Sequence, residues 1–211
     1  MGLEVAFLGV CLCAYLLGSI PFGLVIAHVR KVDLRSIGSG NIGATNAARA
    51  LGKGWGVLVL LLDAGKAVLP VCICQRYLGT LPLFSSAGLA GGASWGDWLA
   101  AAAGGSAFLG HLYPIWAGFR GGKGVATAFG CFISLEPRAA LISFAVYALA
   151  YGVTRISSVG SLLSVLGFPL FLYLTGGQRP SYVLTGVMVA FILLRHQDNI
   201  RRLLARKEQR V

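Results

Sequence analysis

Seven apolar runs dominate this sequence of 211 residues and restrict what it can fold into. They cover residues 4–28, 55–75, 99–119, 124–136, 138–153, 158–175 and 181–195. A helix needs about 20 apolar residues to cross a bilayer, and inside the bilayer every backbone hydrogen bond has to be made within the protein. The pattern therefore predicts an all-α, polytopic membrane protein with seven transmembrane helices. The fourth run has 13 residues, so we expect it to cross only part of the bilayer.

The charged residues support a membrane location. Only 12% of the residues are charged, against about 25% in soluble domains. The net charge of +11 could indicate a nucleic-acid partner, but the charges lie between the apolar runs, so we expect none. No basic segment precedes the first run, which is long enough to span, so we expect a transmembrane helix there and no cleavable signal peptide.

Lysine and arginine are distributed unevenly between the two sides of the predicted bundle. With the N-terminus outside, seven spans place 14 of the 18 basic residues on the inside. Basic residues prefer the cytoplasmic side, so we expect an outside N-terminus and a cytosolic C-terminus. An eighth span within the Gly/Ser-rich stretch 80–98 is the alternative, but it would remove this asymmetry, and we expect an interfacial loop there. The basic tail 201–211 is expected near anionic lipid heads.

The segment "GSGNIGATN" (38–46) contains the G-x-G-x-x-G pattern of dinucleotide-binding folds. That fingerprint requires a preceding β-strand, whereas apolar runs lie on both sides here, so the pattern excludes such a fold. Glycines can still let backbone N–H groups converge on an anion, especially at the start of a helix. We expect a short helix over 44–51, ended by Gly52, with Arg49 on the same side as Thr45 and Asn46. A flexible loop with a helix cap is the alternative.

A second glycine-rich loop, "RGGKGVAT" (120–127), opens the short fourth run. It differs from a nucleotide-binding P-loop because Gly124 follows Lys123 where a Ser or Thr would stand. Glycines that lead into a helix, with a lysine as a point charge, nevertheless suit an anion. Since both loops are predicted on the inner side, we expect them to form one phosphate-binding site.

Further polar residues have two interpretations each. Asp63 and Lys66, three residues apart in the second run, form either an internal ion pair or a wall of the site, because isolated charges at that depth are costly. His111 either caps a helix or lines the site. At the inner ends of the last two runs, further candidates for helix capping or ligand binding are Ser157, Ser158, Ser161, His196 and Asn199.

The acidic residues argue against metal chemistry. The aspartates stand at positions 33, 63, 97 and 198, which is too scattered for the metal site of a CDP-alcohol phosphotransferase. We expect no metal and no cofactor. No Ser-His-Asp or Cys-His set is evident, so we also expect no covalent enzyme intermediate. As an alternative to an enzyme, the chain could be a phosphate or organophosphate membrane transporter. Transport needs access from both faces of the membrane, whereas every candidate ligand-binding residue lies on the predicted inner side.

Four motifs, "GSGNIGATN", "DAGK", "GFRGGKGVAT" and "RHQDNIRR", occur in an order and spacing that resembles the bacterial integral-membrane acyl-phosphate:glycerol-3-phosphate acyltransferases. The resemblance extends from "YLLGSIPFG" (15–23) to the tail. It implies a single transmembrane acyltransferase domain over 1–211 in the bacterial cytoplasmic (inner) membrane, with a cytosolic site. Its partners would be acyl phosphate, glycerol 3-phosphate and membrane lipid, without direct use of acyl-CoA or an acyl carrier protein.

The implied reaction moves an acyl group from acyl phosphate to the 1-hydroxyl of glycerol 3-phosphate. It yields lysophosphatidic acid and phosphate, the first step of phospholipid synthesis. The resemblance implies catalytic roles for Ser39, Arg49, Lys123 and His196. It implies phosphate binding by Ser39, Gly40, Asn41, Thr45, Asn46, Arg49, Gly121, Gly122, Lys123, Ser158, Ser161 and Asn199. Ser157 departs from the apolar residue more usual in the family, which leaves open which serine binds phosphate.

Overall fold

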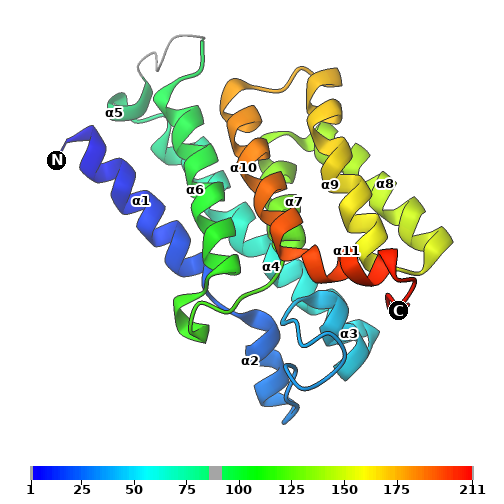
Figure 1. Ribbon diagram of the computed structural model, residues 1–211. Helices are drawn as coiled ribbons and strands as arrows, with labels where there is room; N and C mark the ends of the chain where they lie inside the picture. The colour runs from blue at the N-terminus through cyan, green and yellow to red at the C-terminus, as the bar shows by residue number, and fades with distance from the viewer. Residues whose placement is uncertain (1, 86–91, 211) are drawn as a thin grey trace.

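The computed structural model describes residues 2–85 and 92–210 and has the predicted helical architecture (Figure 1). Short non-α turns occur at Cys74–Leu78, where the backbone forms a π-helix, and at Ile115–Ala117, a 3-10 helix. The α-helices are α1 Leu3–Gly18, α2 Phe22–Val29, α3 Ala44–Leu51, α4 Lys53–Ile73, α5 Pro82–Ser85, α6 Trp95–Leu112, α7 Val125–Leu135, α8 Pro137–Thr154, α9 Ser157–Leu174, α10 Arg179–Arg195 and α11 Gln197–Leu204.

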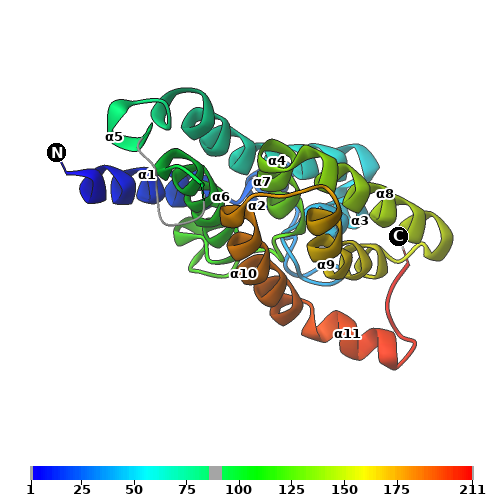
Figure 2. The same ribbon diagram turned by 90° about the horizontal axis from the view of Figure 1, so that it is seen from above.

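The helices pack closely where small residues face each other. Helix α1 lies along α6, and a Cβ added to Gly18 would stand 2.1 Å from the carbonyl oxygen of Ala107. Helix α7 approaches α4 in the same way, with Gly130 against the backbone of Ala64. Small residues at such crossings are typical of helices that pack within a membrane. Figure 2 shows α1 on one side of the bundle and the α8–α9 hairpin on the other.

Four segments of the described chain are long and apolar enough to cross a bilayer. They are Leu3–Val29, Lys53–Leu78, Pro137–Thr154 and Ser157–Leu174. Helix α7 is confirmed as short, with 11 residues. Helices α6 and α10 do not meet the same criteria, so the count of seven spans stays a prediction.

The predicted span over 4–28 is confirmed as long and apolar enough to cross a bilayer, but it is not one continuous helix, because the chain breaks between Gly18 and Phe22. Proline has no backbone N–H and its ring disfavours the helical conformation in the preceding residue, so Pro21 accounts for the break at Ile20. The carbonyl group that the break frees is not left unpaired. Lys66 Nζ on α4 donates a hydrogen bond to Ile20 O over 3.0 Å.

The third predicted run, 99–119, is also wrong at both ends, since α6 covers Trp95–Leu112. At its start, Ser94 and Asp97 form a capping box, in which each side chain accepts a hydrogen bond from the other residue's backbone N–H. At its end, Pro114 stops the helix. Of the predicted loop 80–98, residues 82–85 form α5 and 95–98 belong to α6, while 86–91 lie outside the described residues.

The segments predicted to bind phosphate gather at one end of the bundle. Helices α2, α3 and α11 lie at the lower end in Figure 1, where the C-terminal tail also ends beside α3. The N-terminus and the α9–α10 connection lie at the opposite end. The two glycine loops are tied together there, because the guanidinium of Arg35 donates to the carbonyls of Ala117 and Arg120.

Candidate phosphate-binding site

A cavity of about 370 Å³ opens between the two glycine loops and extends into the bundle. Its inner part is lined by apolar side chains that include Phe129, Phe132 and Phe168. Gly40, Gly121 and Gly122 do not line it, although they were predicted to bind phosphate. Ten predicted site residues do line it: Ser39, Asn41, Thr45, Asn46, Arg49, Lys123, Ser158, Ser161, His196 and Asn199.

The first loop is shaped by its own side chains. The buried amide of Asn46 accepts a hydrogen bond from Ser39 N and donates to the carbonyls of Leu34 and Ile37 at 2.9 and 3.0 Å. Asn41 Oδ1 accepts from Gly43 N at 2.9 Å. Asn46 therefore uses its polar atoms on the loop itself, and its predicted contact with phosphate stays a prediction.

Helix α3 is confirmed over Ala44–Leu51 and carries Thr45 and Arg49 into the cavity. Thr45 Oγ1 lies 2.9 Å from Ser157 Oγ, which joins the first loop to the start of α9. Arg49 donates to the carbonyl of Gln209 at 3.1 Å, while its buried Nε has no partner. Burial lowers the pKa of Arg49, and the nearby Glu208 opposes that shift.

The second loop is bonded differently from the prediction. The N–H groups of Gly121 and Gly122 donate to the carbonyls of Leu112 and His111, both at 3.1 Å, and so are not available to an anion. Arg195 binds the carbonyls of the same two glycines from the other side, at 2.7 and 3.0 Å. Helix α7 begins at Val125, and the first N–H groups of a helix have no acceptor within that helix. These N–H groups are therefore the backbone donors that this loop can offer to an anion.

Lys123 follows these glycines and carries the loop's charge into the cavity. Its Nζ donates to Asn199 Oδ1, which brings α11 to the loop. Burial lowers the pKa of Lys123 to about 8, although the carboxylate of Glu208 opposes that shift. The ammonium is still the main form at neutral pH, so Lys123 can attract a phosphate.

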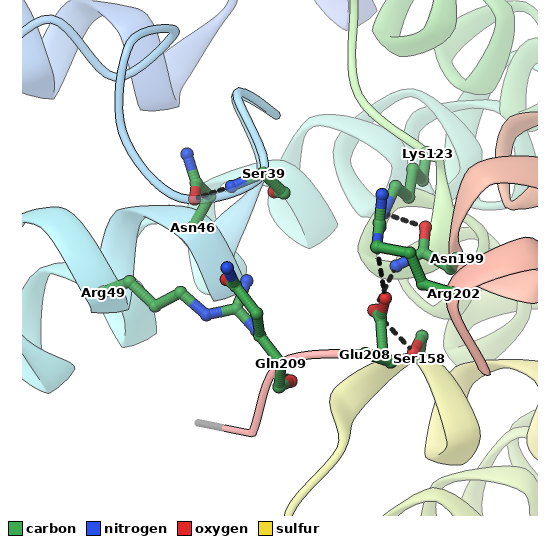
Figure 3. Close-up of polar contacts among 9 residues, drawn as sticks. All are labelled: Ser39, Asn46, Arg49, Lys123, Ser158, Asn199, Arg202, Glu208 and Gln209. Atoms are coloured by element: carbon green, nitrogen blue, oxygen red, sulfur yellow. Dashed lines mark hydrogen bonds and ion pairs between the residues drawn. The ribbon is translucent and has the colours of Figure 1, made fainter. Parts of the chain in front are cut away.

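The tail after α11 returns to the cavity and brings Glu208 into it, as Figure 3 shows. The Glu208 carboxylate accepts from Ser158 Oγ at 2.9 Å, and also from Asn199 Nδ2 and Arg202 Nε. Burial alone would raise the pKa of Glu208, but the hydrogen bonds from Arg202, Asn199 and Ser158 outweigh it, and the pKa is lowered. Our sequence analysis missed Glu208. The available signal was an acidic residue standing alone in the basic tail 201–211.

His196 connects α10 to α11 and is buried beside the cavity. Its Nδ1 lies 2.8 Å from the Ile192 carbonyl, an acceptor, so Nδ1 carries a proton. Burial, and then the charge of Lys123, lower the pKa of His196 to about 4. The imidazole is therefore neutral near pH 7, and Nε2 is free of a proton and able to accept one.

Asp63 and Lys66 form the buried ion pair that was one of the two predicted interpretations, with Nζ 2.9 Å from Oδ1. The other interpretation holds for Asp63, which also lines the cavity. His111 is confirmed as a cavity residue, with Nδ1 3.4 Å from the same Asp63 oxygen. Arg195 entered the sequence analysis only as the first residue of the motif "RHQDNIRR", and its two bonds to the second loop were not predicted.

Comparison with known proteins agrees with this geometry. The family model described as glycerol-3-phosphate acyltransferase matches residues 8–206. A glycerol-3-phosphate acyltransferase of Anaeromyxobacter dehalogenans strain 2CP-1 is 48% identical over 93% of both chains. One from Aquifex aeolicus is 42% identical over 93% of this chain and 95% of its own.

Solved structures show the same fold. The crystal structure of PlsY (YgiH), an integral membrane glycerol 3-phosphate acyltransferase, in its glycerol 3-phosphate form has a TM-score of 0.85 and 40% identity, covering 98% of this chain and 96% of that one. Its lysophosphatidic acid form gives a TM-score of 0.83 over 97% and 95%. The chain therefore belongs to the glycerol-3-phosphate acyltransferase family of integral-membrane enzymes.

Proposed function

We propose that the cavity holds acyl phosphate and glycerol 3-phosphate together and transfers the acyl group to the 1-hydroxyl. The observation that carries this proposal is that one cavity is lined by both glycine loops and extends among apolar side chains. The hydroxyl oxygen bonds to the acyl carbon, the bond from that carbon to the phosphate oxygen breaks, and inorganic phosphate leaves. The products are lysophosphatidic acid and phosphate, without acyl-CoA or a carrier protein.

The charges of the cavity suit two phosphates. Two phosphate groups repel each other, and Arg49 and Lys123 supply one positive charge from each loop. The hydroxyls of Ser39 and Ser161 are further donors at the same place, whereas the Ser158 hydroxyl donates to Glu208 in this structure. Because phosphate is a good leaving group, the main requirement is to hold the hydroxyl about 3–3.5 Å from the acyl carbonyl. The same donors stabilise the negative charge that develops on that carbonyl oxygen.

The apolar part of the cavity suits the acyl chain. Phe129, Phe132 and Phe168 line it beyond the polar groups, together with Met188. An acyl chain placed there would leave water, which is favourable by about 25 cal/mol for each Å² of apolar surface. The phosphate end would then stay beside Lys123.

The proton of the attacking hydroxyl goes to one of two acceptors in this proposal. His196 Nε2 is unprotonated, but a pKa of about 4 makes it a weak base. A phosphate monoester has a second pKa of about 6 and is the stronger base of the two. We therefore assign the proton to a substrate phosphate, with His196 orienting the hydroxyl. That monoester is the phosphate of glycerol 3-phosphate. The departing inorganic phosphate becomes more basic once its bond to the acyl carbon has broken, so it takes the proton from the monoester and carries it away, and no covalent acyl-enzyme forms.

We place the site on the cytosolic face of a bacterial cytoplasmic membrane and expect one transmembrane domain over residues 1–211. The support is the excess of basic residues in the loops at the end of the bundle that carries the cavity. In this orientation the phosphate groups of both substrates face the cytosol, and the product's acyl chain can enter the bilayer directly.

The test is phosphate release by the purified protein from palmitoyl phosphate and glycerol 3-phosphate, without CoA or added metal. Lys123→Ala is expected to lower kcat/KM by about 10²–10³-fold, which is typical for loss of one charge-stabilising group. Lys53→Ala removes an exposed lysine outside the cavity and is the matched control, with activity unchanged. Wild-type activity in Lys123→Ala would show that the second loop binds no reacting phosphate.

A further inference from the structure

Three buried polar residues from α4 and α6 lie next to one another, and one of them, His111, contacts the second glycine loop. Asp63, Lys66 and His111 are each no more than 4% exposed. One oxygen of Asp63 serves both partners, at 2.9 Å from Lys66 Nζ and 3.4 Å from His111 Nδ1. Neither Asp63 Oδ1 nor His111 Nδ1 has a hydrogen-bond partner among the described residues. The carboxylate is therefore paired in charge with Lys66 and meets the imidazole as a close neighbour.

His111 supports the second loop through its backbone and its ring. Its carbonyl accepts the N–H of Gly122 at 3.1 Å. A Cβ added to Gly122 would stand 2.1 Å from His111 Nε2, and one added to Gly121 would stand 2.0 Å from His111 O. Gly122 therefore packs against the His111 ring and Gly121 against the His111 carbonyl, with no space for a side chain. The position of His111 thus limits the position of the loop that carries Lys123.

Lys66 points to a different part of the molecule. Its ammonium donates to Ile20 O at the break between α1 and α2 and lies 5.8 Å from the centre of the Phe22 ring. Asp63 and His111 line the cavity, whereas Lys66 does not. An ion pair that served only to hold helices together would not need the imidazole on the cavity side.

We propose that Asp63 is a positioning residue for acyl transfer. It acts through His111 to hold Gly121, Gly122 and Lys123 in the position that phosphate binding requires. The inference rests on the phosphate site proposed above. Lys66 neutralises the carboxylate, and the His111 contact transmits its position to the loop. Loss of a partner that orients a site residue in this way typically costs about 10- to 100-fold at metal sites, and we expect a comparable effect here.

The test separates positioning from helix pairing. Asp63→Asn alone leaves Lys66 without its charge partner and can impair folding, so the main variant is the double replacement Asp63→Asn with Lys66→Met, which removes both charges. We expect it to keep a thermal unfolding temperature near that of the wild type and to raise the KM of at least one phosphorylated substrate about tenfold or more, as argued above. His111→Phe keeps a ring beneath Gly122 but cannot contact Asp63, and is expected to show the same KM defect.

The matched control is Asp97→Asn, which makes the same chemical change as Asp63→Asn. Asp97 lies at the start of α6, at the opposite end from His111, and forms the capping box with Ser94. This variant is expected to lower the unfolding temperature and leave both KM values unchanged. Wild-type KM values in the double variant and in His111→Phe would overturn the inference. If Lys123→Ala also kept wild-type activity, the proposed phosphate site itself would fail, so the two failures are distinguishable.

Discussion

The backbone of the loop at 38–43 is hydrogen-bonded by side chains a few residues away, whereas that of the loop at 120–124 is hydrogen-bonded by residues from α6 and α10, with Asp63 of α4 behind His111. In the first loop, Asn46 and Asn41 bond the nearby backbone, and Gly38 and Gly40 have positive φ angles of 59° and 67°. In the second, Gly121 and Gly122 are needed because His111 leaves no space for a side chain. The first loop needs glycine for its backbone conformation. The second needs it for close approach at Gly121 and Gly122, and for a φ of 88° at Gly124.

The two loops are therefore sensitive to different substitutions. The hydrogen bonds that shape the first loop are short-range, although its Ile42 also packs with Ile26 of α2 and Val59 of α4. The second loop is correct only when α4, α6 and α10 are all in place, because Asp63, His111 and Arg195 come from these helices. A distant substitution should therefore disturb the second loop more than the first.

Among substitutions that should affect only one of the two loops, we expect Arg195→Met to cause the largest loss of activity, through the second loop. This substitution removes both hydrogen bonds to the carbonyls of Gly121 and Gly122. A misplacement of about 1 Å at a reacting group can cost about 100-fold, and we expect a loss of that order in kcat/KM. Arg201→Met, at an arginine whose side chain is 76% exposed, is the control. Equal activities of the two variants would mean that the second loop holds its shape unaided.

The pH dependence should distinguish the two cations of the site. The pKa of Lys123 is lowered to about 8, so raising the pH above that value removes its positive charge and kcat/KM falls, approaching about tenfold per pH unit. Arginine stays protonated over this range, so Arg49 contributes no such decline. We expect Lys123→Arg to move the decline to higher pH, whatever its activity at neutral pH. An unchanged alkaline limb in that variant would assign the decline to another group.

The smallest expected effect concerns glycine in the first loop. Gly40→Ala places a side chain at a φ of 67°, which costs about 1–2 kcal/mol of stability. Gly54→Ala, in the first turn of α4, meets nothing within 4 Å and should stabilise by about 0.5–1 kcal/mol. Thermal unfolding in detergent measures both. The same sign of change in the two variants would contradict a conformational requirement at Gly40.

The parts that sequence reasoning predicted correctly depend on local signals. The helix over 44–51 and its end at Gly52 were predicted because a short run of good helix formers precedes a glycine. The shortness of α7 was evident from its apolar length. The break at Pro21 was also a local signal, but the long apolar run around it obscured that signal.

The missed parts depend on contacts between distant segments. Nothing near Gly121 in the sequence shows that its N–H group is taken by Leu112 or its carbonyl by Arg195. Glu208 reaches Ser158 across 50 residues, because the chain turns back after α11. Such partners follow from the packing of the helices, which the spacing of motifs does not reveal.

The return of the tail makes part of the site accessible to proteolysis. Arg206 and Lys207 are exposed between α11 and Glu208, and trypsin cleaves after basic residues. A single cut there would detach the carboxylate that binds Ser158, Asn199 and Arg202 while every helix stayed intact. The nicked protein would keep its helical circular dichroism, so that signal alone does not report an undamaged enzyme.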